Sequence, residues 1–161
     1  MTADLPSVTV SDRLRLICPV DPAIDFDAVE PAALQAYADL EDLDADKLPL
    51  KDGADPIWFT VAPLSKRELD TARALSGIGG DNNDDEDRTL AAVSFCWYMV
   101  RFGLRAIDGR EWPYRRTRRR GVMILPEAAL DALSEHEVGF LARVIGSRSG
   151  LPFGRAAHSG S

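Results

Sequence analysis

The feature that most constrains the fold is a stretch over residues 87–107 that is helical in pattern and apolar nearly all round. One face of this expected helix carries five apolar residues: Leu90, Val93, Trp97, Val100 and Leu104. A second face carries Phe95, Met99 and Phe102. A helix that is apolar on every side is stable in water only when other elements cover it. We therefore expect a buried central helix around which the rest of the chain packs.

Strand and helix signals on either side of this helix predict an α+β domain. Strands are expected within residues 8–18, 57–61 and 122–125, and further helices over residues 31–43, 65–76, 126–133 and 134–149. Two of these helices open with a capping box, at Ser65–Glu68 and Ser134–Glu137, in which serine and glutamate satisfy each other's backbone amides. We expect a small sheet packed on one long buried helix, with two to three further helices and extended termini.

Charge is distributed unevenly along the chain and suggests its domain organisation. Residues 1–56 carry 13 acidic and 4 basic side chains, residues 57–100 carry 7 and 4, and residues 101–161 carry 6 and 11, within a total of −7. An acidic front and a basic back can attract each other within one molecule or between copies in an assembly. We expect an acidic N-terminal arm with a short strand and helix (1–54), an α+β core domain (55–150) and a C-terminal tail (151–161).

The apolar runs and the cysteines predict the compartment. The longest apolar run, residues 90–100, has 11 residues, whereas a bilayer span needs about 20. No membrane association is expected. Cys18 and Cys96 lie 78 positions apart in a chain without a secretory leader pattern, so we expect both to be reduced inside a cell. Cys96 lies in an apolar stretch, where a free cysteine behaves as a small core residue.

The most conspicuous motif is a run of five arginines in six positions. The candidate interface consists of these and two neighbouring aromatic residues: Arg115, Arg116, Arg118, Arg119, Arg120, Trp112 and Tyr114. Three interpretations stay open. The run forms a solvated hairpin loop balanced by the acidic residues 81–87, or it binds an acidic protein neighbour, or it binds nucleic-acid phosphates with the aromatic rings stacked on bases. The net charge of −7 disfavours nucleic acid as the main partner.

Catalytic and metal-binding patterns are not found in the sequence. The acidic loop supplies alternating oxygen ligands as a calcium loop does, at Asp81, Asn83 and Asp85. Its sixth position is Glu86 in place of glycine, and its twelfth is Ala92 in place of glutamate, so the pattern fails. His136 and His158 have no partners at zinc spacing, and no nucleophile elbow or phosphate loop occurs. We expect no enzyme activity, no cofactor and no metal.

Three segments, taken in order, carry a resemblance to a known class of proteins. Residues 55–68 form a strand followed by Pro-Leu-Ser and a capped helix, and residues 100–109 lead from a long helix into an Asp-Gly turn. Residues 125–138 begin with Leu-Pro-Glu and continue into the second capping box. This order, over about residues 55–150, resembles tail assembly chaperones and related accessory proteins from the structural-gene clusters of tailed bacteriophages. The acidic N-terminal 50 residues and the arginine run depart from that pattern.

The resemblance implies a non-enzymatic virion structural protein, present in the host cytoplasm during assembly. We favour a capsid decoration or cement protein that bridges neighbouring subunits, because terminal segments of this composition become ordered only when neighbours hold them. Its partners would be major capsid or tail subunits and copies of itself, bound through avidity. The alternative is a tail assembly chaperone or a neck or tail accessory protein. A nucleic-acid-binding regulator is the third interpretation.

Overall fold

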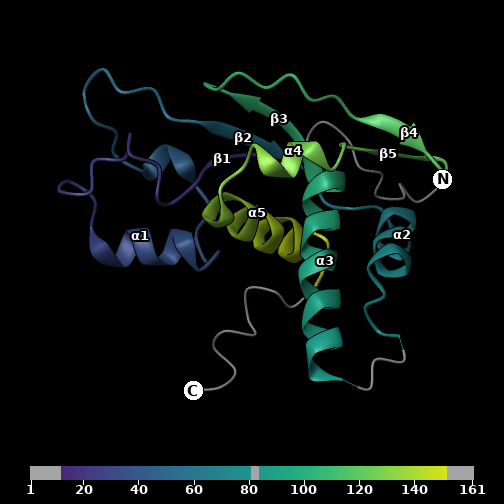
Figure 1. Ribbon diagram of the computed structural model, residues 1–161. Helices are drawn as coiled ribbons and strands as arrows, with labels where there is room; N and C mark the ends of the chain where they lie inside the picture. Colours follow the sequence, from purple (N-terminus) through teal and green to yellow (C-terminus); the bar gives the residue numbers. More distant parts are fainter. Residues whose placement is uncertain (1–11, 81–83, 152–161) are drawn as a thin grey trace, which may run out of the picture.

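The computed structural model describes residues 12–80 and 84–151 and confirms an α+β fold. An antiparallel sheet of order β1-β2-β3 lies at one end of the molecule, with the helices beneath and beside it (Figure 1). The strands of this sheet and of a separate hairpin are β1 (Leu14–Ile17), β2 (Trp58–Val61), β3 (Leu104–Asp108), β4 (Thr117–Arg119) and β5 (Val122–Ile124). The helices are α1 (Pro31–Ala38), the 3-10 turn η2 (Ala45–Lys47), α2 (Lys66–Ser76), α3 (Asp85–Gly103), α4 (Ala128–Asp131) and α5 (Glu135–Arg148).

The central strand β2 organises the core. Phe59 and Val61 are fully buried on one face of the strand, whereas Trp58 and Thr60 are half-buried on the other, as the two-residue period of a strand requires. Phe59 pairs with β1 on one side and with β3 on the other. The buried face joins one continuous core cluster with the inner residues of α3 and α5, which include Met99, Phe102, Leu141 and Ile145.

The long central helix ends earlier than its pattern predicts. We expected a helix over residues 87–107, but α3 ends at Gly103 and β3 begins at Leu104 with no connecting loop. Glycine is a poor helix former, and residues 104–108 pair antiparallel with β2 instead, with a shift of register that leaves Arg105 without a paired residue. The junction is fixed to the sheet because the Ala62 amide donates to the Gly103 carbonyl at 2.9 Å.

Burial of α3 is concentrated in its C-terminal half. Phe95, Met99, Val100 and Phe102 are buried as expected. The N-terminal half is mostly exposed apart from Ala91, and Leu90 in it is 61% exposed. Trp97, in the C-terminal half, is also 46% exposed. In Figure 1 the first turns of α3 extend beyond the neighbouring helices, so nothing among the described residues covers their outer side. The expectation of a helix buried throughout is therefore wrong for the N-terminal half.

The expected acidic arm is part of the core. Leu16, Ile17, Ile24 and Tyr37, all before residue 54, are buried in the same cluster as β2 and α5. The Tyr37 hydroxyl donates to the Ile17 carbonyl and accepts from the Ile17 amide at 2.9 Å. Both backbone polar groups of Ile17, on the edge strand β1, are therefore hydrogen-bonded. The boundary at 54/55 thus does not separate two packing units. Residues 1–11 and 152–161, the outer arm and the tail, lie outside the described residues.

Local signals placed most helix ends correctly. Both capping boxes are present, with Ser65 and Ser134 each accepting from the backbone amide of the glutamate three residues on. α1 begins at Pro31 as expected but ends at Ala38, well before residue 43. The chain turns away there, because Leu40 adopts a left-handed conformation with φ of 64°.

Candidate interaction surfaces

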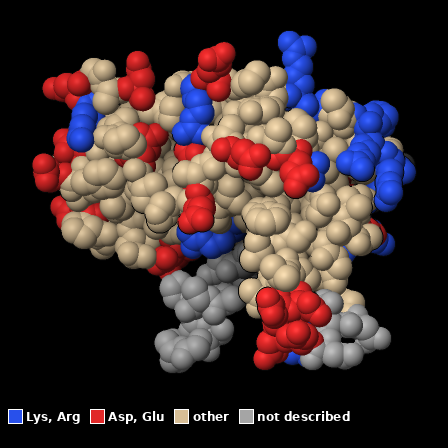
Figure 2. Space-filling view, in the orientation of Figure 1, with Lys and Arg blue, Asp and Glu red and all other residues tan. Residues whose placement is uncertain are grey.

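The arginine run forms a tight β-hairpin. Arg119 pairs with Val122 across the hairpin, and the two-residue turn consists of Arg120 (φ 52°) and Gly121 (φ 80°). Positive φ at both turn positions is the geometry that best matches the twist of paired strands. The exposed arginines of the run are Arg115, Arg118, Arg119 and Arg120. The hairpin β4–β5 lies at the right of Figure 1, and Figure 2 shows a basic area on that side of the molecule.

Arg116 differs from the other arginines of the run because it turns inward. Its guanidinium Nη2 lies 3.5 Å from Glu68 Oε2 and donates to the Met123 carbonyl at 3.0 Å. Arg105, on β3, approaches the same Glu68 oxygen at 4.0 Å. The structure thus divides the expected interface into four exposed arginines and one that is held beneath the hairpin.

The two aromatic residues beside the run pack against each other. The rings of Trp112 and Tyr114 meet edge to face with centroids 4.9 Å apart, and both side chains are half-buried against the core. Their faces are therefore only partly available for stacking on a base.

Two residues of α2 extend the basic area. The Arg67 guanidinium lies against the hairpin turn, where a Cβ at Gly121 would be 2.5 Å from Arg67 Nη2. Lys66 and Arg67 line a shallow depression together with Arg120. We name as the basic surface Lys66, Arg67, Arg115, Arg118, Arg119 and Arg120. The run alone could not reveal the two α2 residues, because only the fold brings the first turn of α2 to the hairpin.

The acidic segment expected to balance the arginines lies elsewhere. Asp84 caps α3, and its first turn contains Asp85, Glu86 and Asp87. This end of α3 is the acidic area at the bottom of Figure 2, well separated from the hairpin. Among the described residues no ion pair joins the two segments, and residues 81–83 lie outside that part of the chain.

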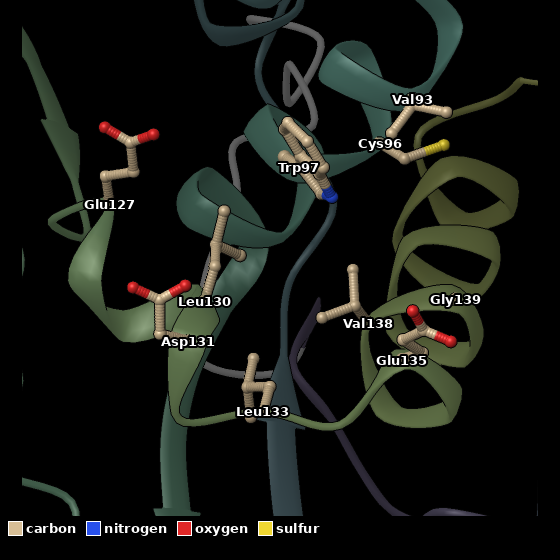
Figure 3. A pocket seen from close by; sticks show the side chains of 10 residues that line it. All are labelled: Val93, Cys96, Trp97, Glu127, Leu130, Asp131, Leu133, Glu135, Val138 and Gly139. Carbon is tan, nitrogen blue, oxygen red and sulfur yellow. The ribbon is translucent and has the colours of Figure 1, made fainter. Parts of the chain in front are cut away.

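A second surface, an apolar groove, lies beside the exposed face of α3 that carries Val93 and Trp97. Its volume is about 460 Å³. The walls come from three helices and the turn between α4 and α5, and are formed by Val93, Cys96, Trp97, Leu130, Leu133, Val138 and Gly139 (Figure 3). The Trp97 indole projects into the opening from α3, opposite Leu130 and Val138. Three carboxylates, Glu127, Asp131 and Glu135, stand at the rim, so the groove is apolar inside and acidic at its edge.

The titratable groups that line the groove are three carboxylates and one thiol. None of its ten lining residues is a histidine, lysine or arginine. Burial raises the pKa of the Cys96 thiol, so this cysteine stays protonated and is a weak nucleophile. Cys96 is half-buried in the groove wall and not deep in the core as we expected, whereas Cys18 is buried. The groove could not be predicted from the sequence, since it depends on how α4 and α5 pack against α3.

The remaining buried charges are satisfied within the fold. Arg110 donates to both Glu137 oxygens, at 2.9 and 2.6 Å. Burial tends to raise the pKa of Glu137, but hydrogen bonds from Arg110 and Ser134 outweigh it and the pKa is lowered. Asp21 accepts from the backbone amides of Ala23 and Ile57 at 2.8 Å, which fixes the start of β2. These groups hold elements together.

His136 is exposed on the first turn of α5. Within residues 12–80 and 84–151 no cluster of histidine, cysteine or carboxylate side chains could hold a metal ion. His158 and the start of the suspected calcium loop fall outside these ranges. No helix in the described part of the chain is long and apolar enough to cross a membrane.

Comparison with known proteins yields no match: no family model, no curated protein and no solved structure is similar to the chain.

Proposed function

We propose that this chain is a non-enzymatic structural protein that bridges neighbouring subunits of an assembly. The observation that carries the proposal is the presence of two complementary surfaces on one molecule, the acid-rimmed apolar groove and the basic surface. In its most specific form the protein decorates or cements the capsid of a tailed phage, the setting that the sequence resemblance implies. Major capsid or tail subunits and further copies of the chain are then its partners.

The occupant proposed for the groove is the arginine hairpin of a neighbouring copy. An arginine side chain combines an apolar stem with a planar cation. The stem would lie along Leu130 and Val138, and the guanidinium would reach the rim carboxylates or stack on the exposed Trp97 ring. Such a contact joins different surfaces of two copies, so it propagates head to tail into a closed ring or an open filament.

Support for a non-enzymatic role comes from the buried titratable groups. Glu137 is engaged by Arg110, and Asp21 by two backbone amides. A general acid or base must be free to exchange a proton with substrate. These carboxylates serve as fold contacts instead.

A charge-swap experiment tests the contact between copies. One variant carries Arg118→Glu, Arg119→Glu and Arg120→Glu, and the other carries Glu127→Lys, Asp131→Lys and Glu135→Lys. We expect self-association, measured by sedimentation equilibrium, to weaken about tenfold or more in each variant alone. An equimolar mixture of the two should associate again, because each altered surface meets a complementary one. Unchanged association of either variant, or no recovery in the mixture, contradicts the proposal.

Mass spectrometry of purified particles tests the phage setting. A capsid decoration protein is expected at a copy number on the order of that of the major shell protein. A few to a few dozen copies would favour the neck or tail. Presence in lysates with absence from particles would favour a tail assembly chaperone, for which the apolar groove is a suitable client site. A steep salt dependence of DNA binding would favour the nucleic-acid-binding regulator.

A further inference from the structure

The most poorly compensated charges in the described part of the molecule lie beneath the hairpin. Arg105 and Arg116 flank Glu68, and Arg13 lies close enough to disfavour the charged form of both guanidinium groups. The residues come from separate elements: Arg13 precedes β1, Arg105 is on β3, Arg116 precedes β4 and Glu68 is on α2. We name this group the arginine cluster.

Glu68 cannot neutralise the arginine cluster. Its Oε1 accepts from the Ser65 amide at 2.8 Å as part of the capping box. Only Oε2 faces the arginines, at 3.5 and 4.0 Å, which is ion-pair distance without a short hydrogen bond. One carboxylate, with one of its oxygens bound to a backbone amide, is therefore the ion-pair partner of two guanidinium groups, and the third arginine, Arg13, adds to the positive charge around them.

Hydrogen bonding in the cluster is also incomplete. The Nε–H groups of Arg105 and Arg116 are buried and have no acceptor. A buried donor without a partner costs free energy, and a guanidinium has five donors to satisfy. Burial and the neighbouring Arg105 lower the pKa of Arg116 to about 10, against the partial compensation from Glu68. Burial likewise lowers the pKa of Arg105. The missing acceptors and the lowered pKa values both indicate that the arginine cluster has too few negative or acceptor groups around its guanidinium groups.

We propose that Arg105 and Arg116, with the exposed Arg13 nearby, form an anion site that takes a side-chain carboxylate from an acidic protein segment. Guanidinium groups bind carboxylates strongly through paired hydrogen bonds. The side chains of Arg105 and Arg116 are only 14% and 18% exposed, so a ligand reaches a small part of each guanidinium. This limited access suits a single carboxylate better than a nucleic-acid backbone, which binds through many exposed phosphate contacts. This site is independent of the proposed function, because it rests on charge balance within one chain.

Fluorescence anisotropy with a labelled hexaglutamate peptide tests the site at low ionic strength. Binding to the full chain should weaken about tenfold or more in Arg105→Met and in Arg116→Met. Arg119→Met is the matched control, since it removes one charge from an exposed position of the same hairpin and should change binding by less than about twofold. Equal losses in all three variants would show diffuse attraction and overturn the proposal.

A second variant keeps the test independent of folding defects. Glu68→Gln removes the competing carboxylate, while glutamine retains an oxygen for the Ser65 amide and so preserves the capping box. This variant should bind hexaglutamate more tightly than the wild type. Unchanged or weaker binding would contradict an anion site. Tighter binding of a short random-sequence DNA duplex than of hexaglutamate would assign the site to phosphates and overturn the acidic-protein partner.

Discussion

The two capping boxes share one local pattern, yet the glutamates that complete them have opposite surroundings. In α5, Glu137 receives two short hydrogen bonds from the single arginine Arg110. In α2, Glu68 stands at ion-pair distance from Arg105 and Arg116, neither of which it fully satisfies. The same serine–glutamate motif thus ends in a closed ion pair at one site and in an excess of positive charge at the other. Helix capping is encoded locally, whereas charge balance depends on which strands the fold brings to the helix.

The largest expected effect is on stability when an arginine is removed from each site. Arg110→Met should lower the free energy of unfolding by about 3 kcal/mol, because Glu137 is left as an unpaired buried charge. Arg116→Met should leave it unchanged or raise it by about 1 kcal/mol, because a poorly compensated cation is replaced by an apolar side chain. Urea denaturation measures both. A loss at Arg116 as large as that at Arg110 would erase the distinction between the two sites.

An effect of intermediate size is expected on the free energy of unfolding when the pH is varied, because the ion pair of Arg110 and Glu137 needs a charged glutamate. The pKa of Glu137 is lowered on folding from its ordinary 4.5, so its contribution to stability is complete above that value and is lost as the pH falls through the folded pKa. Glu137→Gln should therefore cost about 2 kcal/mol near neutral pH and progressively less in acid.

Urea denaturation between about pH 3 and pH 7 measures this difference. Glu135→Gln, an exposed change in the same helical turn, is the matched control and should cost less than about 0.5 kcal/mol at neutral pH. A cost for Glu137→Gln that stays constant over the whole range would contradict the ion pair.

The smallest effect is expected from the serines, where the two sites should behave alike. Ser65→Ala and Ser134→Ala each remove one cap hydrogen bond and should each cost about 1 kcal/mol. Thermal unfolding followed by circular dichroism provides the comparison. Costs that differ severalfold would mean that the surrounding arginines influence capping itself.

Sequence reasoning succeeded where the signal is local. Both capping boxes, the stop of α2 at Gly77 and the strand through Phe59 follow from a few neighbouring residues, and the structure contains them. The α+β class follows from the same signals taken together. The end of α3 was missed because Gly103 is a weak stop, and the gain from pairing residues 104–108 with β2 is invisible along the chain.

The candidate surfaces were predictable only in part. The density of arginines marks the hairpin, but nothing in the run distinguishes Arg116 from its exposed neighbours. Arg105 is a single arginine within a strand and carries no signal of its own. The groove could not be predicted, because helical periodicity groups Val93 and Trp97 with the core residues of α3. In the structure the neighbouring elements leave these two side chains exposed.

The groove and the arginine cluster are connected by a short stretch of backbone, because β3 follows α3 without a loop. Gly103 packs so tightly on α5 that an added Cβ would lie 2.6 Å from Ile145, so the junction has no slack. Trp97 stands on the helix two turns before this point, and Arg105 stands on the strand two residues after it. Because the helix joins the strand directly at this tightly packed glycine, no loop is present to absorb a displacement of the helix. A partner that tilts the exposed turns of α3 must either distort the Gly103–Ile145 contact or move the backbone that carries Arg105.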